Sequence, residues 1–409
     1  MKKIVVVGAG PAGASVAWLL AQRGMKVTLL EKETAFGRVF RGEGLMPAGL
    51  DALHEMGLQD VYAQIPSRQL TSWDFYVGAQ RRMRVLEPVE NGLATQIIDQ
   101  GSLLREIVQQ AKQYSNFEFL SGWQVNELLE ESGKIVGVSA SCEREKRELF
   151  ADCVLACDGR YSRLRTLAEL SLTSSDPKNS QEGQFDVLWF KLPAQGLFEN
   201  ETPFIACLQP NNQFAFYPSW DGTLQIGWIV EKSDRKQNLA ELKKRDWCEL
   251  FASALPEKLA LPFRAKKADL IGPIFLDVQV GCAAQWSIPG LLLLGDAAHP
   301  MAPNRAQGIN MALRDAIVAT NHLVSLQDAP ITAGALAVIQ HEREAEVRAV
   351  QKMQLAEWRK VSLLSTPGLP YSGFKTLLSL FGRFKPTQDF WLHEQKGLRE
   401  GVVSVKLTV

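Results

Sequence analysis

Two apolar runs and one stretch of helical spacing make up the first 31 residues. The β-branched run Ile4–Val7 is followed by glycine and predicts a buried parallel strand. Ala14–Arg23 has helical periodicity, and Gly24 follows it as a C-terminal cap. Lys26–Glu31 returns to a strand pattern. The segment therefore predicts a strand–helix–strand unit of a doubly wound α/β sheet.

The middle of the chain has a different pattern, in which short aromatic runs are separated by turn residues. Asn211–Asn212 and Asp221–Gly222 predict hairpin turns that join strands such as 213–217 and 223–230. We therefore expect an antiparallel sheet inserted into an α/β protein.

Helical patterns return on either side of this insertion. A helix is predicted over 100–114 and strands over 118–155. A buried strand, 291–294, precedes a long predicted helix from about 306 to 326, and 332–362 is helical and rich in charge. The remaining tail is apolar from Leu363 to Phe384. It is expected to pack on the α/β domain that contains the first strand–helix–strand unit, with a partner or a membrane surface as the alternatives.

Composition narrows the classes of function. The 409 residues carry 45 basic and 45 acidic side chains, which argues against a nucleic-acid binder that relies on a broad basic field. The six cysteines and five histidines show no metal-ligand spacing, so we expect buried reduced thiols and no metal. No apolar run reaches the roughly 18 residues of a membrane span. A cytoplasmic protein without an integral membrane segment is expected.

A glycine-rich turn, GAGPAG, joins the first predicted strand to the first predicted helix. Its glycines allow a tight turn, close approach of a pyrophosphate and tight helix–strand packing, while the helix N-terminus favours an anion. Glu31 can accept hydrogen bonds from ribose hydroxyls and disfavours a 2′-phosphate. The unit predicts a site for FAD or NAD rather than NADP. The residues assigned to it are Gly8, Gly10, Pro11, Ala12, Gly13, Glu31 and Lys32.

Two further motifs place an acidic residue directly after a predicted strand. One is LLLLGDAAHP at 291–300, which leads through Pro303 into the long helix. The other ends in Asp158–Gly159. Along the chain the order is GAGPAG, Asp158–Gly159, GDAAH, within residues 8–310. With these three motifs in this order, the sequence resembles the class A flavoprotein monooxygenases of the para-hydroxybenzoate hydroxylase type.

The resemblance implies a set of contacts to FAD. The Asp of GDAAH holds the ribityl chain, the turn that follows lies along the flavin ring, and the Asp-Gly motif lies near the pyrophosphate. Arg41 is the preferred arginine for the cofactor, with Arg38 as its competitor, and Gln100 lies against the cofactor at the start of a helix. The other implied cofactor-binding residues are Asp158, Gly159, Gly295, Asp296, Pro303, Ala306, Gln307, Gly308, Ile309 and Asn310.

One position departs from the family pattern. Ala306 stands where the first glycine of the GQG turn is usual, and Arg305 precedes it. We expect the methyl group to crowd or shift the flavin ring. His299 is expected chiefly as a structural part of its turn.

The resemblance also implies the fold, which is an α/β FAD-binding Rossmann-like domain of the glutathione-reductase type with an inserted antiparallel substrate-binding sheet and a C-terminal helical segment. The FAD-binding domain would comprise 1–70, 95–175 and 275–330. The substrate-binding sheet domain would comprise 71–94 and 176–274, and the helical segment and tail 331–409.

The chemistry implied is that of a hydroxylase or epoxidase. NADH or NADPH reduces FAD, reduced FAD captures O2 as the C4a-hydroperoxide, and one oxygen passes to an aromatic or apolar small molecule. No catalytic side chain is assigned, because the flavin carries the chemistry. Three alternatives stay open, namely a flavin-dependent reductase of isoprenoid-type double bonds, a flavin-dependent halogenase, and a non-enzymatic flavin-binding sensor. The sequence predicts no oligomeric state.

Aromatic side chains of the inserted sheet are candidates for substrate contact, since they suit a flat or apolar molecule. Strand alternation predicts that Tyr217 faces away from the others of its strand. Each residue has core packing as its competing interpretation. The candidates are Trp73, Phe75, Phe214, Phe216 and Trp228.

Overall fold

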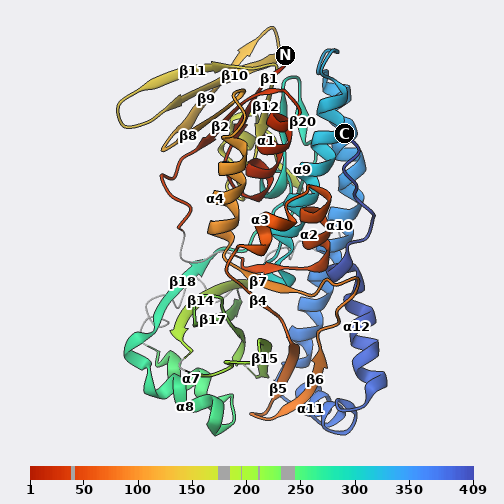
Figure 1. The fold of residues 1–409 in the computed structure, drawn as a ribbon. Helices are drawn as coiled ribbons and strands as arrows, with labels where there is room; N and C mark the ends of the chain where they lie inside the picture. Colours follow the sequence, from red (N-terminus) through yellow and green to blue (C-terminus); the bar gives the residue numbers. More distant parts are fainter. Residues whose placement is uncertain (38–41, 174–184, 195, 211, 232–244) are drawn as a thin grey trace.

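The computed structural model spans residues 1–409 and describes all of them except 38–41, 174–184, 195, 211 and 232–244. Figure 1 shows an elongated molecule with a mostly parallel sheet at its upper end and an antiparallel sheet at its lower end. The predicted fold class, an α/β flavoprotein fold with an inserted sheet and C-terminal helices, is confirmed.

A six-stranded sheet with the order β20-β21-β12-β1-β2-β8 forms the first layer. All neighbouring strands are parallel except β20 and β21. The four inner strands are short, apolar and buried on both faces, as expected where helices cover a parallel sheet. The strands are β1 (Lys3–Val7), β2 (Lys26–Glu31), β8 (Phe117–Ser121), β12 (Cys153–Ala156), β20 (Ser287–Ile288) and β21 (Leu291–Leu293).

Helices α1 (Pro11–Gln22), α4 (Gln100–Ala111) and α9 (Gln307–Ser325) pack together on this sheet. Ten of the twelve residues of α1 are buried, because α9 and α4 cover the faces that the sheet leaves open. Gly24 follows α1 with a φ of +82°, a backbone conformation that suits glycine. The strand–helix–strand unit predicted for the first 31 residues is therefore present.

The second sheet has seven strands in the order β18-β14-β17-β16-β15-β5-β6. Its pairs are antiparallel except β15 with β5. Helices α7 (Trp247–Ser253) and α8 (Glu257–Ala265) cover one face. The strands are β5 (Ser72–Val77), β6 (Arg81–Leu86), β14 (Phe185–Pro193), β15 (Pro203–Gln209), β16 (Asn212–Pro218), β17 (Thr223–Glu231) and β18 (Ile271–Leu276).

Smaller elements connect the two sheets. Sheet β3-β7-β4 lies between them, β9–β11 form an antiparallel sheet at the upper end, and β13 pairs with β19. These elements are β3 (Gly44–Leu45), β4 (Ser67–Gln69), β7 (Gln96–Ile98), β9 (Gln124–Glu131), β10 (Lys134–Ser141), β11 (Lys146–Phe150), β13 (Leu172–Thr173), β19 (Cys282–Ala283), α2 (Pro47–Glu55), α3 (Gln59–Ala63) and α5 (Arg163–Leu167), with 3-10 turns η2 (Lys267–Asp269), η3 (Gly295–Ala297) and η4 (Asn304–Ala306).

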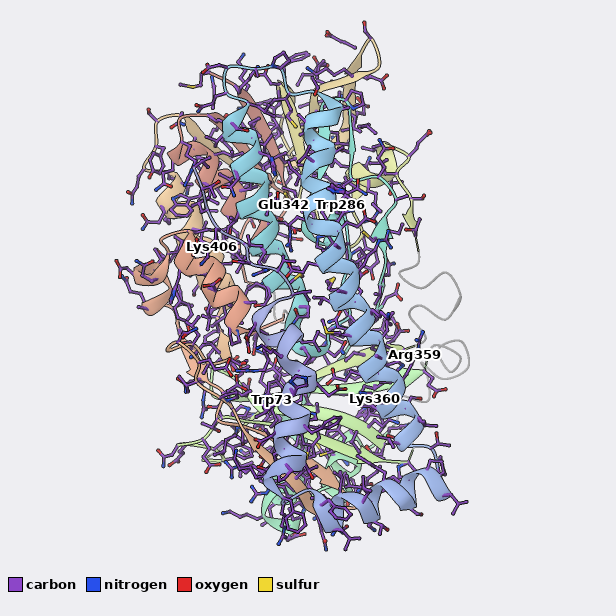
Figure 2. All side chains as sticks on the ribbon, turned by 90° about the vertical axis from the view of Figure 1, so that its right-hand side faces the viewer. Trp73, Trp286, Glu342, Arg359, Lys360 and Lys406 are labelled. Atoms are coloured by element: carbon purple, nitrogen blue, oxygen red, sulfur yellow. The ribbon has the colours of Figure 1, made fainter. Side chains whose placement is uncertain are left out.

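Three C-terminal helices follow α9. The first, α10 (Ala333–Leu364), runs along the molecule from the parallel sheet towards the antiparallel sheet, α11 (Leu369–Phe381) lies across the lower end, and α12 (Lys385–Glu400) runs back upward (Figures 1 and 2). None of the described helices is long and apolar enough to cross a bilayer. All six cysteines are free thiols.

One predicted turn differs in register. Asn212 already pairs with Gln209 in the β15–β16 ladder, so it belongs to the strand rather than to the hairpin turn. Asn211 lies outside the described residues. The second predicted turn, Asp221–Gly222, joins β16 to β17, with Gly222 at a φ of +77°.

Candidate active site

The three sequence motifs meet at one edge of the parallel sheet. The GAGPAG turn follows β1, the Asp-Gly motif follows its neighbour β12, and the GDAAH motif follows β21 on the far side of β12. Parallel strands end on the same edge, and open α/β sheets bind ligands outside the carboxyl ends of their strands. The fold thus assembles the predicted site from segments nearly 300 residues apart.

Two glycines of the first motif are required by packing. A Cβ on Gly13 would stand 1.8 Å from the carbonyl oxygen of Gly8, and one on Gly8 would stand 2.4 Å from the carbonyl oxygen of Cys157. Gly8 also has a φ of +98°. The turn is therefore pressed against both its own helix and the neighbouring β12.

Gly10 differs, because a Cβ placed there would meet no atom within 4 Å. It is the N-cap of α1, and no side chain caps this helix end. The free backbone N–H groups therefore point into open space and can receive an anion. Glu31 lies beside them and accepts a hydrogen bond from the Ala9 N–H at 2.8 Å. Lys32 is exposed next to it.

The Asp-Gly motif is held by its own helix. The carboxylate of Asp158 accepts hydrogen bonds from the Ser162 hydroxyl at 2.5 Å and from the Leu164 N–H at 3.0 Å. Gly159 has a φ of +84° and open space where a Cβ would be. Asp158 thus holds Ser162, the N-cap of α5, and the first turn of that helix, while the space beside Gly159 stays open.

The GDAAH segment connects the first motif to α9. A Cβ on Gly295 would lie 3.2 Å from the Cβ of Ala12, so the N-terminal turn of α1 packs directly on it. Asp296 follows, and its Oδ1 lies 3.6 Å from the Cβ position of Gly308. Desolvation raises the pKa of Asp296, partly offset by Arg160, whose Nε lies 3.9 Å from the carboxylate.

His299 has the structural role that we expected. It is buried, packs against Trp286 with tilted rings whose centroids are 4.9 Å apart, and its Nε2 lies 2.6 Å from Asp315. Asp315 also accepts a hydrogen bond from the Gly295 N–H at 3.0 Å and pairs with Arg343 at 2.8 Å. Although burial alone would raise the pKa of Asp315, His299 and Arg343 outweigh it and lower the pKa to about 2. The His299 ring therefore fixes the GDAAH turn.

The turn before α9 takes an uncommon backbone path. Arg305 and Ala306 both adopt the left-handed conformation, with φ of 60° and 50°. The Ala306 methyl group faces Gly44, where a Cβ would lie only 2.8 Å away. No side chain caps α9, so its first N–H groups are available. The alanine is therefore accommodated by a glycine opposite.

The following residues anchor this turn from behind. The Gln307 side chain donates to the carbonyl oxygens of Arg305 and Leu398, which directs it towards the end of α12. Asn310 donates to the Ala306 carbonyl and accepts from the Met46 N–H at 3.0 Å. A ligand can therefore contact the backbone groups of Gln307, Gly308 and Ile309. Pro303 precedes the turn as the N-cap of η4.

Arg305 joins this turn to the antiparallel sheet, a link that sequence analysis missed. Its guanidinium lies 4.3 Å from the ring centroid of Trp73 and 4.9 Å from that of Trp391. It also pairs with Glu357 of α10, through an Nε–Oε1 distance of 3.0 Å. The only sequence signal was an arginine at a turn position. The partners Glu357 and Trp391 lie in the C-terminal segment, where we expected no part of the site.

The face of the antiparallel sheet that contains Trp73 is aromatic. Trp73 contacts Phe204 at 5.0 Å, Phe75 contacts Trp391 at 5.3 Å, and Tyr217 stacks on Phe204 at 5.9 Å, all between ring centroids. Figure 2 labels Trp73 where the C-terminal helices meet this sheet. Trp73 and Phe75 thus lie on the side of the sheet that faces the α9 turn.

The other three substrate candidates are corrected by the structure. Phe214, Phe216 and Trp228 point to the opposite face and form a core with Phe251 and Phe263 of α7 and α8. Side chains alternate along a strand, and the helices bury that face. As predicted, Tyr217 faces away from Phe214 and Phe216. It lies on the same face as Trp73, where α11 and α12 pack on the sheet and both side chains are buried.

A buried acid lies between the two sheets. Glu43 accepts a hydrogen bond from the Ser219 hydroxyl at 2.7 Å, and Lys191 lies 3.7 Å from its carboxylate. Lys191 is paired more closely, at 2.8 Å, with the partly exposed Asp221. Desolvation raises the pKa of Glu43 to about 7, against the lowering effects of Ser219 and Lys191. Sequence analysis gave this residue no role.

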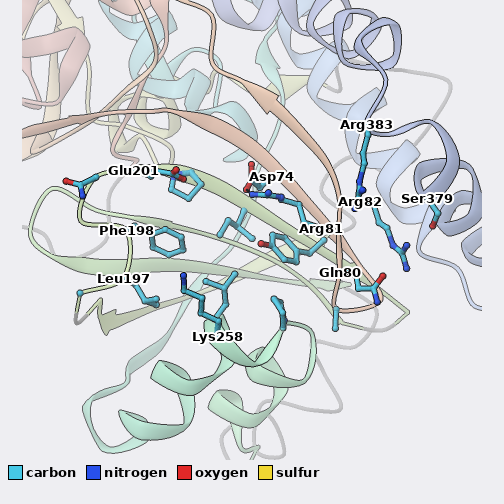
Figure 3. Close-up of a pocket in the computed structure, with 18 residues that line it drawn as sticks. Asp74, Gln80, Arg81, Arg82, Leu197, Phe198, Glu201, Lys258, Ser379 and Arg383 are labelled. Atoms are coloured by element: carbon cyan, nitrogen blue, oxygen red, sulfur yellow. Dashed lines mark hydrogen bonds and ion pairs between the residues drawn. The ribbon is translucent and has the colours of Figure 1, made fainter.

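A cavity of about 700 Å³ opens elsewhere, on the α8 side of the antiparallel sheet (Figure 3). It is lined by Asp74, Arg81, Phe198 and Lys258 among others. Asp74 and Arg81 come from β5 and β6, Phe198 from the loop before β15 and Lys258 from α8, and none of the three motifs lines the cavity. We therefore separate it from the candidate active site.

Comparison with known proteins decides the family. A family profile described as "FAD binding domain" matches residues 1–353. The chain is 31% identical over 329 residues to 6-methylpretetramide 4-monooxygenase of Streptomyces rimosus, which covers 77% of this chain and 73% of that protein. This chain belongs to the class A FAD-dependent monooxygenases. It is accordingly an FAD-dependent oxidoreductase.

Other monooxygenases extend the comparison. Squalene monooxygenase SE1 of Panax ginseng is 28% identical over 339 residues, covering 80% of this chain and 59% of that protein. Among solved structures, p-nitrophenol 4-monooxygenase PnpA of Pseudomonas putida superposes with a TM-score of 0.78, at 20% identity, over 98% of this chain and all of that one. A flavin-dependent halogenase, CmlS, superposes at 0.71 with 16% identity over 97% of this chain and 70% of that one. At these identities the structures show a shared fold.

The geometry fits the FAD of a class A monooxygenase. Two uncapped helix N-termini, those of α1 and α9, border the same strand edge, and both offer backbone N–H groups to negative charge. Open space at Gly10 and Gly159 leaves room for close approach. Gln100 is buried at the first position of α4, whereas the predicted phosphate ligand Arg41 and its competitor Arg38 lie outside the described residues.

Proposed function

We propose that this monooxygenase binds FAD along the α1 and α9 N-termini and oxygenates a flat aromatic or apolar molecule held against Trp73, Phe75, Phe204 and Tyr217. NADH or NADPH would supply the electrons and O2 the oxygen. The observation that carries the proposal is the position of Arg305. Its backbone belongs to the turn assigned to the flavin, while its guanidinium contacts Trp73.

The chain's own residues bind, orient and exclude water. In this proposal Gly8, Gly10 and Gly13 admit the pyrophosphate, Glu31 accepts from ribose, and Asp296 accepts from the ribityl chain. When bound, FAD supplies the redox and oxygen-transfer chemistry. The α9 N-terminus then favours negative charge on the ring. The aromatic wall, formed by Trp73, Phe75, Phe204 and Tyr217, keeps water from the reacting atoms.

Aromatic oxygenation is favoured over the alternatives by the relatives and by the wall itself. The first-named relative acts, by its name, on 6-methylpretetramide, and PnpA on p-nitrophenol. Aromatic rings with centroids 5.0 to 5.9 Å apart, of which Phe204 and Tyr217 are stacked, suit flat substrates. An apolar polyene, as the squalene monooxygenase names suggest, is the second candidate. The isoprenoid reductase, the halogenase and the sensor have no comparable support.

The test begins with the purified protein under anaerobic conditions. NADPH and then NADH are added while the visible flavin band is followed. Bleaching by either, followed by incorporation of isotopically labelled O2 into a phenol or polycyclic aromatic, is the expected result. Protein that neither contains nor takes up FAD would overturn the cofactor assignment. A band that stays yellow with a productive substrate present would instead assign reduction to a separate reductase.

A further inference from the structure

Helix α11 carries two apolar stripes, of which only one is buried. Tyr371, Phe374 and Leu378 recur at helical spacing and pack with β5 and β6 of the antiparallel sheet. The apolar tail therefore packs on the protein, but α11 does so on the antiparallel sheet rather than on the α/β domain that we expected. The stripe accounts for how α11 is attached to the molecule.

The second stripe faces away from the protein. Leu377, Leu380 and Phe381 follow the i, i+3, i+4 pattern of one helix face, and their exposed fractions are 56%, 60% and 48%. Phe384, in the turn to α12, is 57% exposed and its ring centroid lies 6.1 Å from that of Phe381, so it extends this face beyond the helix end. Leu369, at the start of the helix, is 89% exposed. A single exposed leucine is ordinary, but a continuous apolar face on one helix marks an interaction surface.

Basic side chains predominate in the segment around this face. In a chain with equal numbers of acids and bases, residues 358–388 contain five basic side chains and no acid. Lys360 and Lys385 pair with acidic residues of α12 at 2.7 Å and 3.0 Å. Lys375 and Arg383 have no acidic partner among the residues that the structure describes. Arg82 of β6 adds a further cation, because its carbonyl oxygen lies against Gly382, and Figure 3 shows it beside Arg383.

The position of α11 allows a flat surface to reach it. The helix lies across the lower end of the molecule, away from the parallel sheet, with α10 and α12 rising from its two ends (Figures 1 and 2). An amphipathic helix with large apolar residues on one face and lysine or arginine beside them binds in the plane of a bilayer interface and prefers anionic lipids.

We propose that the face formed by Leu377, Leu380, Phe381 and Phe384 docks this end of the protein on an anionic lipid bilayer. A bilayer fits better than a second copy of the chain, because the cations beside the face would oppose themselves across a symmetric contact. The attachment is peripheral and leaves the strand edge with the three motifs free.

The test is co-sedimentation of the full-length protein with vesicles of phosphatidylcholine alone or mixed with phosphatidylglycerol. We expect binding to the mixed vesicles, weakened by salt. The partition coefficient of the Leu380→Ser/Phe381→Ser variant should fall by more than about tenfold, because two large apolar side chains are no longer transferred from water into the bilayer. Lys375→Gln/Arg383→Gln should lose about fivefold per charge. Phe150→Ser/Val338→Ser, two exposed apolar residues away from α11, should bind as the parent does.

Each contrary outcome is decisive. No binding to mixed vesicles, or an equal loss in the Phe150/Val338 control, overturns the proposal. Light scattering after size exclusion tests whether a second copy of the chain covers the face instead. If the unsubstituted protein is a dimer and the Leu380/Phe381 variant is a monomer, the face is assigned to a second copy and the proposal is overturned. Unchanged thermal unfolding shows that the variants are folded, and the charge variant, which removes no apolar contact, provides an independent measurement.

Discussion

Gly44 lies directly opposite Ala306, so that a Cβ on the glycine would come within 2.8 Å of the alanine methyl group. This pair explains how the turn before α9 tolerates an alanine where the family pattern has glycine. The methyl group occupies space that Gly44 leaves open, and its effect on the flavin ring stays a prediction. The departure at position 306 and the glycine at position 44 are one structural feature.

The pair predicts the effect of restoring a side chain. Gly44→Ala should displace the turn and weaken FAD binding by at least tenfold, because a contact of 2.8 Å between two methyl groups requires the backbone to move. FAD affinity is measured by quenching of flavin fluorescence. Gly42→Ala is the matched control, since a Cβ there meets nothing within 4 Å. Equal affinity in both variants would refute the close contact.

Gly10→Ala separates ligand binding from folding. A Cβ at this position meets no protein atom within 4 Å, and the φ of −72° suits alanine. The variant without flavin should therefore have the same thermal unfolding temperature as the flavin-free parent protein. Flavin should be lost, because the methyl group occupies the space that the pyrophosphate needs. Absorbance of the purified protein and a thermal melt give both answers. Gly373→Ala, equally open, should stay yellow. A yellow Gly10→Ala protein would place the cofactor elsewhere.

Arg305 and Glu357 should be energetically coupled. Their side chains are 9% and 21% exposed, and Arg305 is enclosed by Trp73 and Trp391. A double-mutant cycle of Arg305→Gln and Glu357→Gln in urea should give about 1–3 kcal/mol of coupling. The control cycle uses Arg264 and Glu249, which pair with similar geometry but are 39% and 54% exposed. That pair should give less than about 1 kcal/mol. A coupling no larger than the control's would mean that the link is weak.

How much the sequence revealed depended on the range of the interactions. The GAGPAG, Asp-Gly and GDAAH motifs were predictable because each needs its residues within one local turn, and the strand edge then brings the motifs together. Alternation separated Phe214 and Phe216 from Tyr217, but it gives two faces without stating which one α7 and α8 cover. Arg305, Glu357 and Trp391 meet only through tertiary packing, and no local pattern announces them.

Asp315 should be critical for stability. It is fully buried between His299 and Arg343, and Arg343 continues the network to Glu346 and Arg314. Asp315→Asn should cost about 3–5 kcal/mol in the free energy of unfolding, because Arg343 loses one of its two anionic partners inside the protein. Asp328→Asn, at a less buried aspartate, is the control for urea unfolding.

The pH dependence of the same residue has a fixed sign. The pKa of Asp315 is lowered to about 2 in the folded protein from an ordinary value of 3.8. Its stabilisation is therefore present above pH 3.8 and is lost as the pH falls towards 2. The parent should lose stability across this window more steeply than Asp315→Asn. Parallel curves would show that other carboxylates dominate acid unfolding.

Glu43 should give a pH dependence of opposite sign. Burial raises its pKa to about 7 in the folded protein, so between pH 4.5 and 7 the folded state holds a proton that the unfolded state has lost. Its contribution to the free energy of unfolding is therefore largest below pH 4.5 and declines as the pH rises to 7, by up to about 3 kcal/mol. Glu43→Gln keeps the Ser219 contact but cannot ionise, and it should flatten this decline. Urea unfolding at several pH values measures it, with the exposed Glu148→Gln as the control. If Glu43→Gln declines as steeply as the parent, the carboxyl group is already ionised at low pH and Lys191, 3.7 Å away, is its effective partner.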